Sequence, residues 1–169
     1  MPARSTATYG VLCILTGALL AVLYVTAPML QTLFTKPSIN DIATDLADPP
    51  AFVATPAPSY PADFADKQRR GYPEIGPLTL DASPDAVFER ARDAAIDMDW
   101  RIRAAEPAEG RLEAVATTPM MRFKDDVVVR LRPEGSGTRV DVRSRSRIGR
   151  HDLGTNARRI QDFLDRLQP

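Results

Sequence analysis

The sequence predicts an α+β fold in which two amphipathic helices cover one face of an antiparallel β-sheet. Short segments that alternate apolar and polar residues follow one another over residues 100–148, with turns between them, as is typical of antiparallel strands. Two longer segments repeat their apolar residues at helical spacing. Consecutive hairpins place strands antiparallel, and a helix with one apolar stripe must bury that stripe. Both helices are therefore expected on the apolar face of the sheet.

A strand and a helix begin this domain. Pro77–Asp81 predicts the strand. Ser83 is the expected N-cap of the helix, because Pro84 follows at the first helical position and the next residue is acidic. The helix runs to about Met98. Its buried stripe is expected to contain Val87, Ala91, Ala94 and Met98.

Four strands and a second helix complete the order βαββββα. The strands are expected at residues 100–104, 111–118, 126–132 and 138–148. Turns at 107–110 and 133–137 join them in hairpins, and Trp100 is expected in the core. Asp152 is the expected N-cap of the last helix. The apolar stripe of that helix contains Leu153, Ala157, Ile160, Leu164 and Leu167.

An uncharged stretch at the front of the chain predicts a transmembrane helix. Residues 5–35 carry no charge, and residues 9–30 form the densest apolar part. At about 1.5 Å per residue, a helix over 9–30 is about 33 Å long, enough to cross a hydrocarbon core of about 30 Å. We expect an uncleaved signal anchor there, after a short cytoplasmic segment at 1–8. The alternative is a cleaved signal peptide, since Val25–Ala27 has the small residues of a cleavage site.

The charges that flank this stretch predict its orientation. Arg4 lies before it, while Lys36 after it is soon followed by acidic residues. The positive-inside tendency then places the N-terminus in the cytoplasm and the domain outside. The single cysteine, Cys13, lies within the uncharged stretch, so the domain itself is indifferent to an oxidising compartment.

Residues 31–70 predict a proline-rich linker that is partly docked on the domain, which then spans 71–169. Prolines recur through this segment and disfavour helix at the residues before them. The segment also carries apolar residues, which favour partial packing against the domain. The prolines within the segment are Pro37, Pro49, Pro50, Pro56, Pro58 and Pro61.

The composition excludes several classes of protein. Lys plus Arg total 22 and Asp plus Glu total 22, which argues against a generally basic nucleic-acid-binding protein. One Cys and one His exclude a disulfide framework and a zinc cluster within one chain, and we expect no metal or cofactor. The charges are unevenly distributed, however. Residues 100–169 hold fifteen basic and ten acidic residues, which favours a basic face with an anionic partner.

The densest polar segment, residues 141–156, predicts the candidate site. Three arginines with two-residue spacing share one strand face and repel one another unless acids or anions lie between them. The alternatives are an anion site near a helix N-terminus and a solvated face paired with acids across the strands. We further predict a junction in which Arg147, Asp152 and Asn156 lock strand to helix. The candidate residues are Arg143, Arg145, Arg147, Arg150, Asp152 and Asn156.

A second polar cluster precedes the longest predicted hairpin. It contains Arg122, Lys124, Asp125 and Asp126. The two aspartates are neighbours on a strand, so they point to opposite faces and are not expected to share a site. Ion pairs with nearby basic residues are the expected role of these carboxylates.

Five blocks of this sequence belong to a pattern seen in a known family. The blocks are Asn40–Phe52, Tyr72–Leu78, Met98–Ile102, Arg122–Arg130 and Val140–Ile160. Together they resemble the DUF1499 family, whose function is unknown. The resemblance implies an envelope or organelle-lumen protein, in this case of the membrane-anchored bacterial branch, and implies docking of the segment that contains Asn40–Phe52. A branch of the family carries Cys in the part that corresponds to Asn40–Asp48; this chain has none there, so a thiol-based function does not transfer.

Taken together, these observations predict a single-pass protein of the bacterial inner membrane with a periplasmic domain. We expect that domain to bind a protein partner, an anionic small molecule or a lipid headgroup through the 143–156 surface, and to be a binding protein rather than an enzyme. One alternative is an enzyme of unassigned type with a polar Arg/Asp/Asn cleft. Another is a purely structural envelope protein.

Overall fold

The computed structural model describes residues 16, 20–22, 24, 26 and 36–168. The chain divides into two compact units, 1–36 and 37–169, and the second holds the folded domain. The predicted span at 9–30 lies mostly outside the described residues. Among those that are described, no helix has both the length and the apolar character that a membrane crossing needs.

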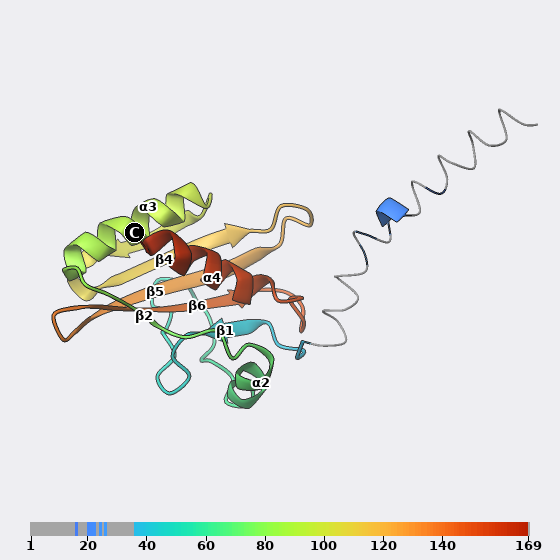
Figure 1. The fold of residues 1–169 in the computed structure, drawn as a ribbon, viewed down its shortest axis with the longest axis horizontal. Coiled ribbons are helices and arrows are strands. Elements are labelled where there is room, and N and C mark those ends of the chain that lie inside the picture. The colour runs from blue at the N-terminus through green and yellow to red at the C-terminus, as the bar shows by residue number, and fades with distance from the viewer. Residues whose placement is uncertain (1–15, 17–19, 23, 25, 27–35, 169) are drawn as a thin grey trace, which may run out of the picture. The chain divides into compact units, whose positions relative to one another are not determined.

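The domain has the predicted α+β fold, with a six-stranded sheet whose strand pairs are all antiparallel (Figure 1). The strands follow the spatial order β1-β6-β5-β4-β3, and β2 also pairs with β6. From β2 to α4 the chain has the predicted order βαββββα. The elements are β1 (Asp41–Ala43), α2 (Phe64–Gly71), β2 (Leu78–Leu80), α3 (Pro84–Asp97), β3 (Arg101–Glu106), a 3₁₀ turn (Pro107–Glu109), β4 (Arg111–Thr117), β5 (Lys124–Glu134), β6 (Gly137–Ser146) and α4 (Thr155–Leu167).

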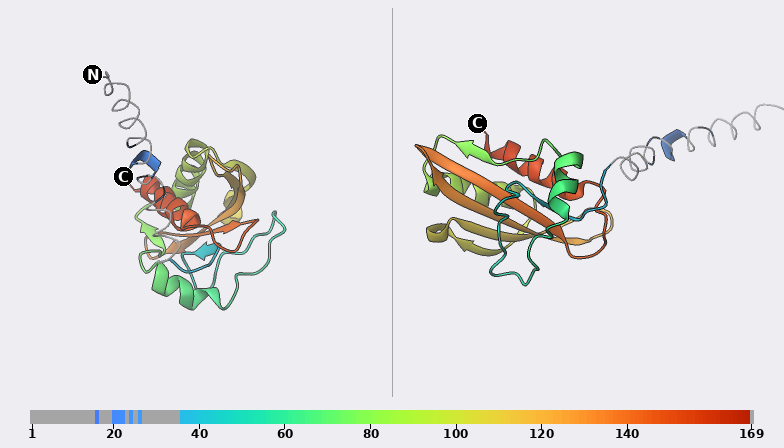
Figure 2. Two further views of the ribbon diagram at one scale, coloured as in Figure 1. Left: turned by 90° about the vertical axis from the view of Figure 1, so that its right-hand side faces the viewer. Right: turned by 90° about the horizontal axis from the view of Figure 1, so that it is seen from below.

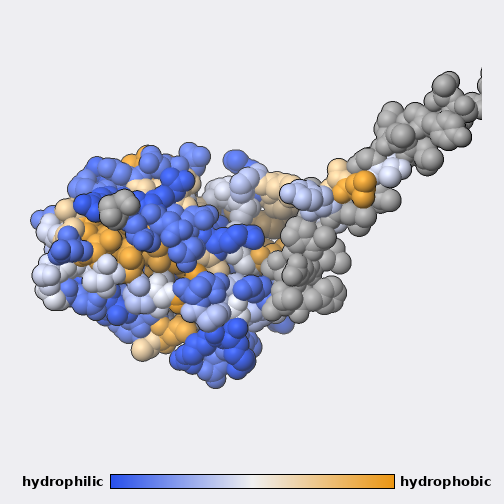
Figure 3. All heavy atoms as spheres, viewed as in Figure 1, coloured by the Kyte–Doolittle hydropathy of each residue, from blue (hydrophilic) through white to orange (hydrophobic). Residues whose placement is uncertain are grey.

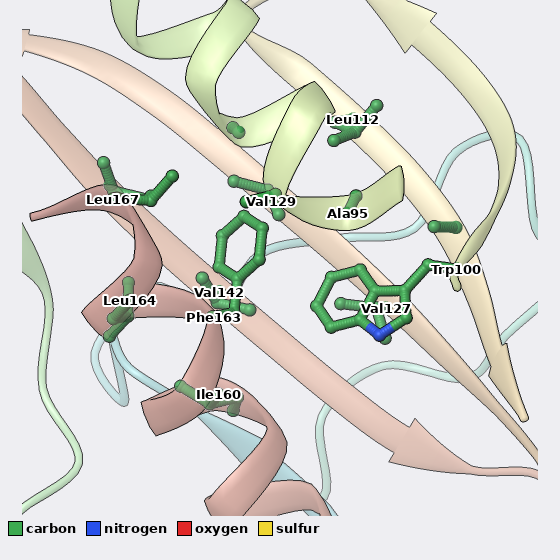
Figure 4. Close-up of a cluster of buried hydrophobic side chains, with 14 of the residues drawn as sticks. Ala95, Trp100, Leu112, Val127, Val129, Val142, Ile160, Phe163, Leu164 and Leu167 are labelled. Carbon is green, nitrogen blue, oxygen red and sulfur yellow. The ribbon is translucent and has the colours of Figure 1, made fainter. Parts of the chain in front are cut away.

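Helices α3 and α4 lie together on one face of the sheet, as predicted (Figures 1 and 2). Between them and the strands, Trp100 stacks on Phe163 with ring centroids 5.0 Å apart (Figure 4). The predicted α4 stripe is buried from Ala157 to Leu167. Leu153 is an exception, because it precedes the helix and has a φ of +56°. The outward surface of this face is mostly hydrophilic (Figure 3).

The segment before β2 is a larger part of the domain than a partly docked linker. It supplies β1 and α2, which sequence reasoning missed, and residues 44–60 cover the sheet face opposite α3 and α4 (Figure 2). We call residues 44–60 the covering segment. Ile39 and Ile42 are fully buried in the core. From α2, the Gln68 side chain donates to the Ala43 carbonyl and accepts from its N–H, at 2.6 and 3.0 Å.

The β5–β6 hairpin is longer than predicted. β5 begins at Lys124 and continues through Pro133 to Glu134, and β6 begins at Gly137. Only two residues therefore form the turn, the first being Gly135 with a φ of +58°. Such a tight turn requires positive φ, which glycine adopts without a steric cost.

Candidate functional site

The predicted alternation on β6 places three arginines on the sheet face opposite the helices. We call Arg143, Arg145 and Arg147 the arginine row; the last of them follows the end of β6 directly. Asp41 on β1 and Asp126 on β5 both lie opposite Arg145 in the strand register. The row is therefore interleaved with carboxylates from the two neighbouring strands.

Arg143 is buried and fully engaged within the protein. Its side chain is 2% exposed, and Nε and Nη2 donate to the two carboxylate oxygens of Asp41 at 2.9 and 2.8 Å. The same guanidinium donates to the backbone carbonyls of Pro50 and Pro58. The rings of Phe52 and Tyr60 lie 5.1 and 5.6 Å from its central carbon. Arg143 thus fastens the covering segment to the sheet, and its guanidinium is occupied by partners within the protein.

Burial also determines the ionisation of the groups around Arg143. It raises the pKa of the Asp41 carboxyl, and the hydrogen bonds from Arg143 oppose this rise. Burial likewise raises the pKa of the Tyr60 phenol, which therefore stays neutral at physiological pH. Tyr60 donates its hydroxyl hydrogen to the side-chain oxygen of Gln68 at 2.9 Å.

Arg147 forms a two-nitrogen pair with Asp126. Its Nε and Nη2 lie 2.9 and 2.6 Å from Asp126 Oδ1. These hydrogen bonds raise the pKa of the Arg147 guanidinium, which stays charged. The predicted pairing of Arg147 with Asp152 is therefore wrong, because Asp126 from the adjacent strand lies directly beside the arginine row.

Arg145 lies between these two pairs without joining either. Its nearest carboxylate oxygens belong to Asp41 and Asp126, at 3.9 and 4.0 Å, beyond hydrogen-bond distance. Its side chain is only 21% exposed. Within residues 36–168, no other arginine of β5 or β6 lacks a hydrogen-bonded carboxylate partner.

A second arginine cluster on the same face is balanced by acids. Arg130, Arg132 and Arg139 all donate hydrogen bonds to Asp45 or Asp141, and two of them also bind Asp48. Three guanidinium groups thus form hydrogen bonds to three carboxylates. Hydrogen bonds from backbone N–H groups and from Arg132 outweigh the effect of burial and lower the pKa of Asp45. Pairing with Asp141 agrees with the alternative of acids on the strands, but Asp45 and Asp48 belong to the covering segment, so this face is covered rather than solvated.

Glu113 of β4 holds the covering segment at a third position. Its carboxylate is fully buried and accepts the N–H groups of Val53, Ala54 and Thr55 at 2.6 to 2.9 Å. Three consecutive N–H groups on one carboxylate fix the path of the backbone here.

The junction between sheet and last helix lies on the opposite, inner face. Asn156 accepts a hydrogen bond from Ser144 at 2.7 Å and donates to Ser146 at 2.9 Å. Arg159 donates to Asn156 at 2.6 Å and to Asp125 at 2.6 Å. Asn156 therefore belongs to a junction as predicted, but its partners are these inner-face residues. Asp125 and Asp126 point to opposite faces, as the alternation requires.

Asp152 and Arg150 lie in the loop that leads into α4. Asp152 accepts the N–H groups of Gly154 and Asn156, each at 2.9 Å, so it caps the helix from two residues before the assigned N-cap, Gly154. Arg150 is exposed, and its carbonyl lies 3.4 Å from the Ser38 hydroxyl. His151 accepts the Leu153 N–H and takes no part in a Ser-His-Asp arrangement.

The second predicted cluster does not form one site. Arg122 is exposed on the loop between β4 and β5, and Lys124 is exposed at the first position of β5, while both neighbouring aspartates are buried in the separate pairs described above. Arg122 has a φ of +57°, which a tight loop imposes on it. Among the described residues, no three metal-ligating side chains gather in one place.

Sequence reasoning missed Asp41, Arg159 and the aromatic pair Phe52 and Tyr60. Arg159 had a usable signal, because it follows Asn156 by three residues and so shares its helix face. Asp41 lies 102 residues before Arg143 and carried no comparable local signal.

Two solved structures and one family model match parts of this chain. CalU16 from Micromonospora echinospora is 19% identical, with 55% of this chain and 74% of that chain covered and a TM-score of 0.38. A protein from Thermus thermophilus is 15% identical, with 54% and 94% covered and a TM-score of 0.31. No protein with a curated description matches in sequence. The family model described as a protein of unknown function, DUF1499, matches residues 41–167, and the chain therefore belongs to the DUF1499 family.

Proposed function

We propose that this protein is a membrane-tethered envelope protein whose domain binds an anionic group, a carboxylate or a phosphate, at Arg145. The observation that carries the proposal is the state of Arg145. It is mostly buried, yet its guanidinium has no hydrogen-bonded acceptor among the described residues. The guanidinium nitrogens of Arg145 are not among the fully buried polar atoms that lack a partner in the described residues, so they are accessible and can form charge-assisted hydrogen bonds to an incoming anion.

The charges of the arginine row support the same conclusion. Its three guanidinium groups meet two carboxylates within 4.0 Å, Asp41 and Asp126, so the row carries one surplus positive charge. In the cluster around Arg139, by contrast, three guanidinium groups meet four carboxylates within 4.0 Å: Asp45, Asp48, Asp141 and Glu134. One singly charged anionic group would neutralise the row.

The Arg145 guanidinium and the carboxylates beside it determine the charge and the shape of the ligand that fits. A guanidinium presents parallel N–H donors that match two oxygens of a carboxylate or phosphate. The flanking carboxylates, 3.9 and 4.0 Å from Arg145, repel a second negative charge. They therefore favour a group that places one charge and two oxygens at the guanidinium, such as a carboxylate or a phosphodiester.

The tether is supported by the sequence. Residues 9–30 are long enough and apolar enough to span a bilayer, and Arg4 favours the orientation with the domain outside the cytoplasm. The class of ligand fits such a location, since phosphodiesters of lipid headgroups and carboxylates of the cell wall are both available there. The bacterial inner membrane is the membrane that the family resemblance suggests.

Titration with inorganic phosphate and with acetate tests the anion site. The full chain in a non-ionic detergent is labelled with ¹⁵N, and the arginine Nε–Hε signals are followed by NMR. We expect a saturable shift of the signal that disappears in Arg145→Gln. The control is Arg103→Gln, which removes an exposed arginine of β3 and should leave the shift intact.

Two results would overturn the anion site. One is an Arg145 signal that does not move with either anion. The other is a linear drift equal to that of the exposed arginines, which reports screening alone.

A reporter fusion tests the tether. Alkaline phosphatase fused after Pro169 should be active in a bacterial host, because that enzyme needs an oxidising compartment. A stable but inactive fusion would refute the proposed orientation. Release of the chain from membranes by alkaline washing would refute the anchor itself.

A further inference from the structure

One end of the sheet presents large apolar side chains to solvent. We call Met120, Met121 and Phe123 of the β4–β5 loop, with Ile148 of the β6–α4 loop, the apolar tip. Their exposed fractions are 86%, 64%, 45% and 72%. Soluble proteins rarely expose several large apolar residues together without a partner for them.

The register of the sheet brings the two loops together. Asp125 pairs with Ser146, and the Arg147 N–H donates to the Lys124 carbonyl at 3.2 Å. Continuing this antiparallel pairing by one residue places Ile148 opposite Phe123. The apolar tip is therefore one surface built from two loops.

Exposed cations flank this surface. The β4–β5 loop contains no acid, and the one acid of the β6–α4 loop, Asp152, accepts backbone N–H groups at the start of α4. Residues 117–124 and 147–151 include no Asp or Glu. The basic residues Arg122, Lys124 and Arg150 are all exposed. The same two segments thus combine exposed apolar side chains with unscreened positive charge, the combination that favours an anionic lipid surface.

The domain begins at this same end of the sheet. The Asn40 side chain donates to the Gly149 carbonyl at 2.6 Å, and the Ser38 hydroxyl lies 3.4 Å from the Arg150 carbonyl. Figure 1 shows the β4–β5 loop at the end of the sheet where the chain enters β1. Seven residues separate Leu30, the end of the apolar stretch, from Ser38, and the eight steps between their Cα atoms span at most about 28 Å when fully extended.

We propose that the apolar tip inserts into the headgroup region of an anionic bilayer, so that the domain is held against the membrane by a second contact besides its tether. The inference shares the tether with the proposed function and does not depend on the anion site at Arg145. A lipid surface is the occupant that fits, because the tip lies beside the tethered end and combines flexible methionines and a phenylalanine with cations. A protein partner would have to fit beneath a domain already confined to the membrane surface.

Fluorescence quenching by brominated lipids tests this contact. The full chain is reconstituted in phosphatidylcholine vesicles with and without phosphatidylglycerol, each with bromine on the acyl chains. Phe123→Trp places a reporter in the tip. Ser136→Trp is the matched control, since Ser136 is exposed in the β5–β6 turn at the opposite end of the sheet. Trp100 is buried in the core of both variants and gives the common background.

We expect quenching of Phe123→Trp well above that of Ser136→Trp, and stronger with phosphatidylglycerol. Adding Arg122→Gln and Lys124→Gln should abolish the dependence on anionic lipid. Equal quenching of the two reporters would overturn the proposal and would mean that the tip faces solvent or another protein.

The failure of this proposal is distinguishable from failure of the proposed function. Arg145→Gln should leave the quenching unchanged, and Phe123→Trp should leave the phosphate-induced NMR shift unchanged. If alkaline washing shows that the chain has no anchor, the protein is added to preformed vesicles, and the same comparison of reporters still decides whether the tip meets lipid.

Discussion

Replacing Arg143 by methionine tests how the covering segment is held. Methionine keeps much of the length of the side chain but removes all four hydrogen bonds that Arg143 makes, two to Asp41 and one each to Pro50 and Pro58. The carboxylate of Asp41 then remains 1% exposed without its closest partner. Removing one member of a buried ion pair costs about 3–5 kcal/mol. We expect a loss near the lower end of this range, because Arg145 is already 3.9 Å from Asp41 and can move closer.

Urea unfolding of the full chain in non-ionic detergent, followed by circular dichroism, measures this loss. Arg103→Met is the control, because Arg103 is exposed on β3 and the same replacement there should change the unfolding free energy by less than about 0.5 kcal/mol. Hydrogen exchange adds a local readout, since the amides of residues 44–60 should exchange faster in Arg143→Met and not in Arg103→Met.

The double variant Asp41→Asn, Arg143→Met isolates the interaction itself. It leaves neither charge unpaired, so it should be less destabilised than the sum of the two single variants. A loss in Arg143→Met no larger than in Arg103→Met, with unchanged exchange of the covering segment, would refute the conclusion that this buried pair holds the segment in place.

Three further outcomes are expected. Asp152→Ala should lower the unfolding free energy by about 0.5–2 kcal/mol, since its carboxylate accepts the N–H groups of Gly154 and Asn156 at the start of α4; an unchanged urea midpoint would contradict this. Ile160→Ala and Leu164→Ala should each lower the unfolding free energy by about 2–5 kcal/mol in the same assay, because both side chains lie in the core. If neither variant also lowers the melting temperature, α4 does not pack on the sheet. The lowered pKa of Asp45 means that its charge stabilises the fold above its unfolded pKa of 3.8 and that this contribution is lost as the pH falls below that value. Asp45→Asn should therefore flatten the acid side of the stability profile, and an unchanged slope there would count against the role of Asp45.

The fold from β2 onward could be predicted because its signals are local. Ser83 followed by Pro84 indicates where α3 begins, and the Ser83 side chain does accept the Ala86 N–H at 3.4 Å. Alternation along β6 correctly separated the arginine row from the inner-face serines. Periodicity of this kind depends only on which side of one element a residue occupies, and not on what lies across from it.

The partners of these residues could not be predicted in the same way. β1 is three residues long and pairs with residues 143–145, about a hundred positions later in the chain. Asp126, rather than Asp152, meets Arg147 because strand register decides proximity, and no spacing in the sequence reveals that register. The proline-rich composition of residues 31–70 correctly excludes long regular elements, but it carries no information about the face on which the segment packs.

The pairing along the outer edge of β6 determines where the chain can be truncated without exposing a strand edge. Along its outer edge, β6 is paired first with β2, then with Thr44, whose side chain accepts the Val142 N–H at 2.9 Å, and then with β1. A fragment that begins at residue 71 would keep β2 and lose the other two. It would present the free backbone groups of residues 142–145 as an open edge, beside Arg143 without its partner Asp41 and without the segment that covers it. Such edges recruit strands from other molecules, so we expect this fragment to aggregate where one that begins at residue 37 stays monomeric.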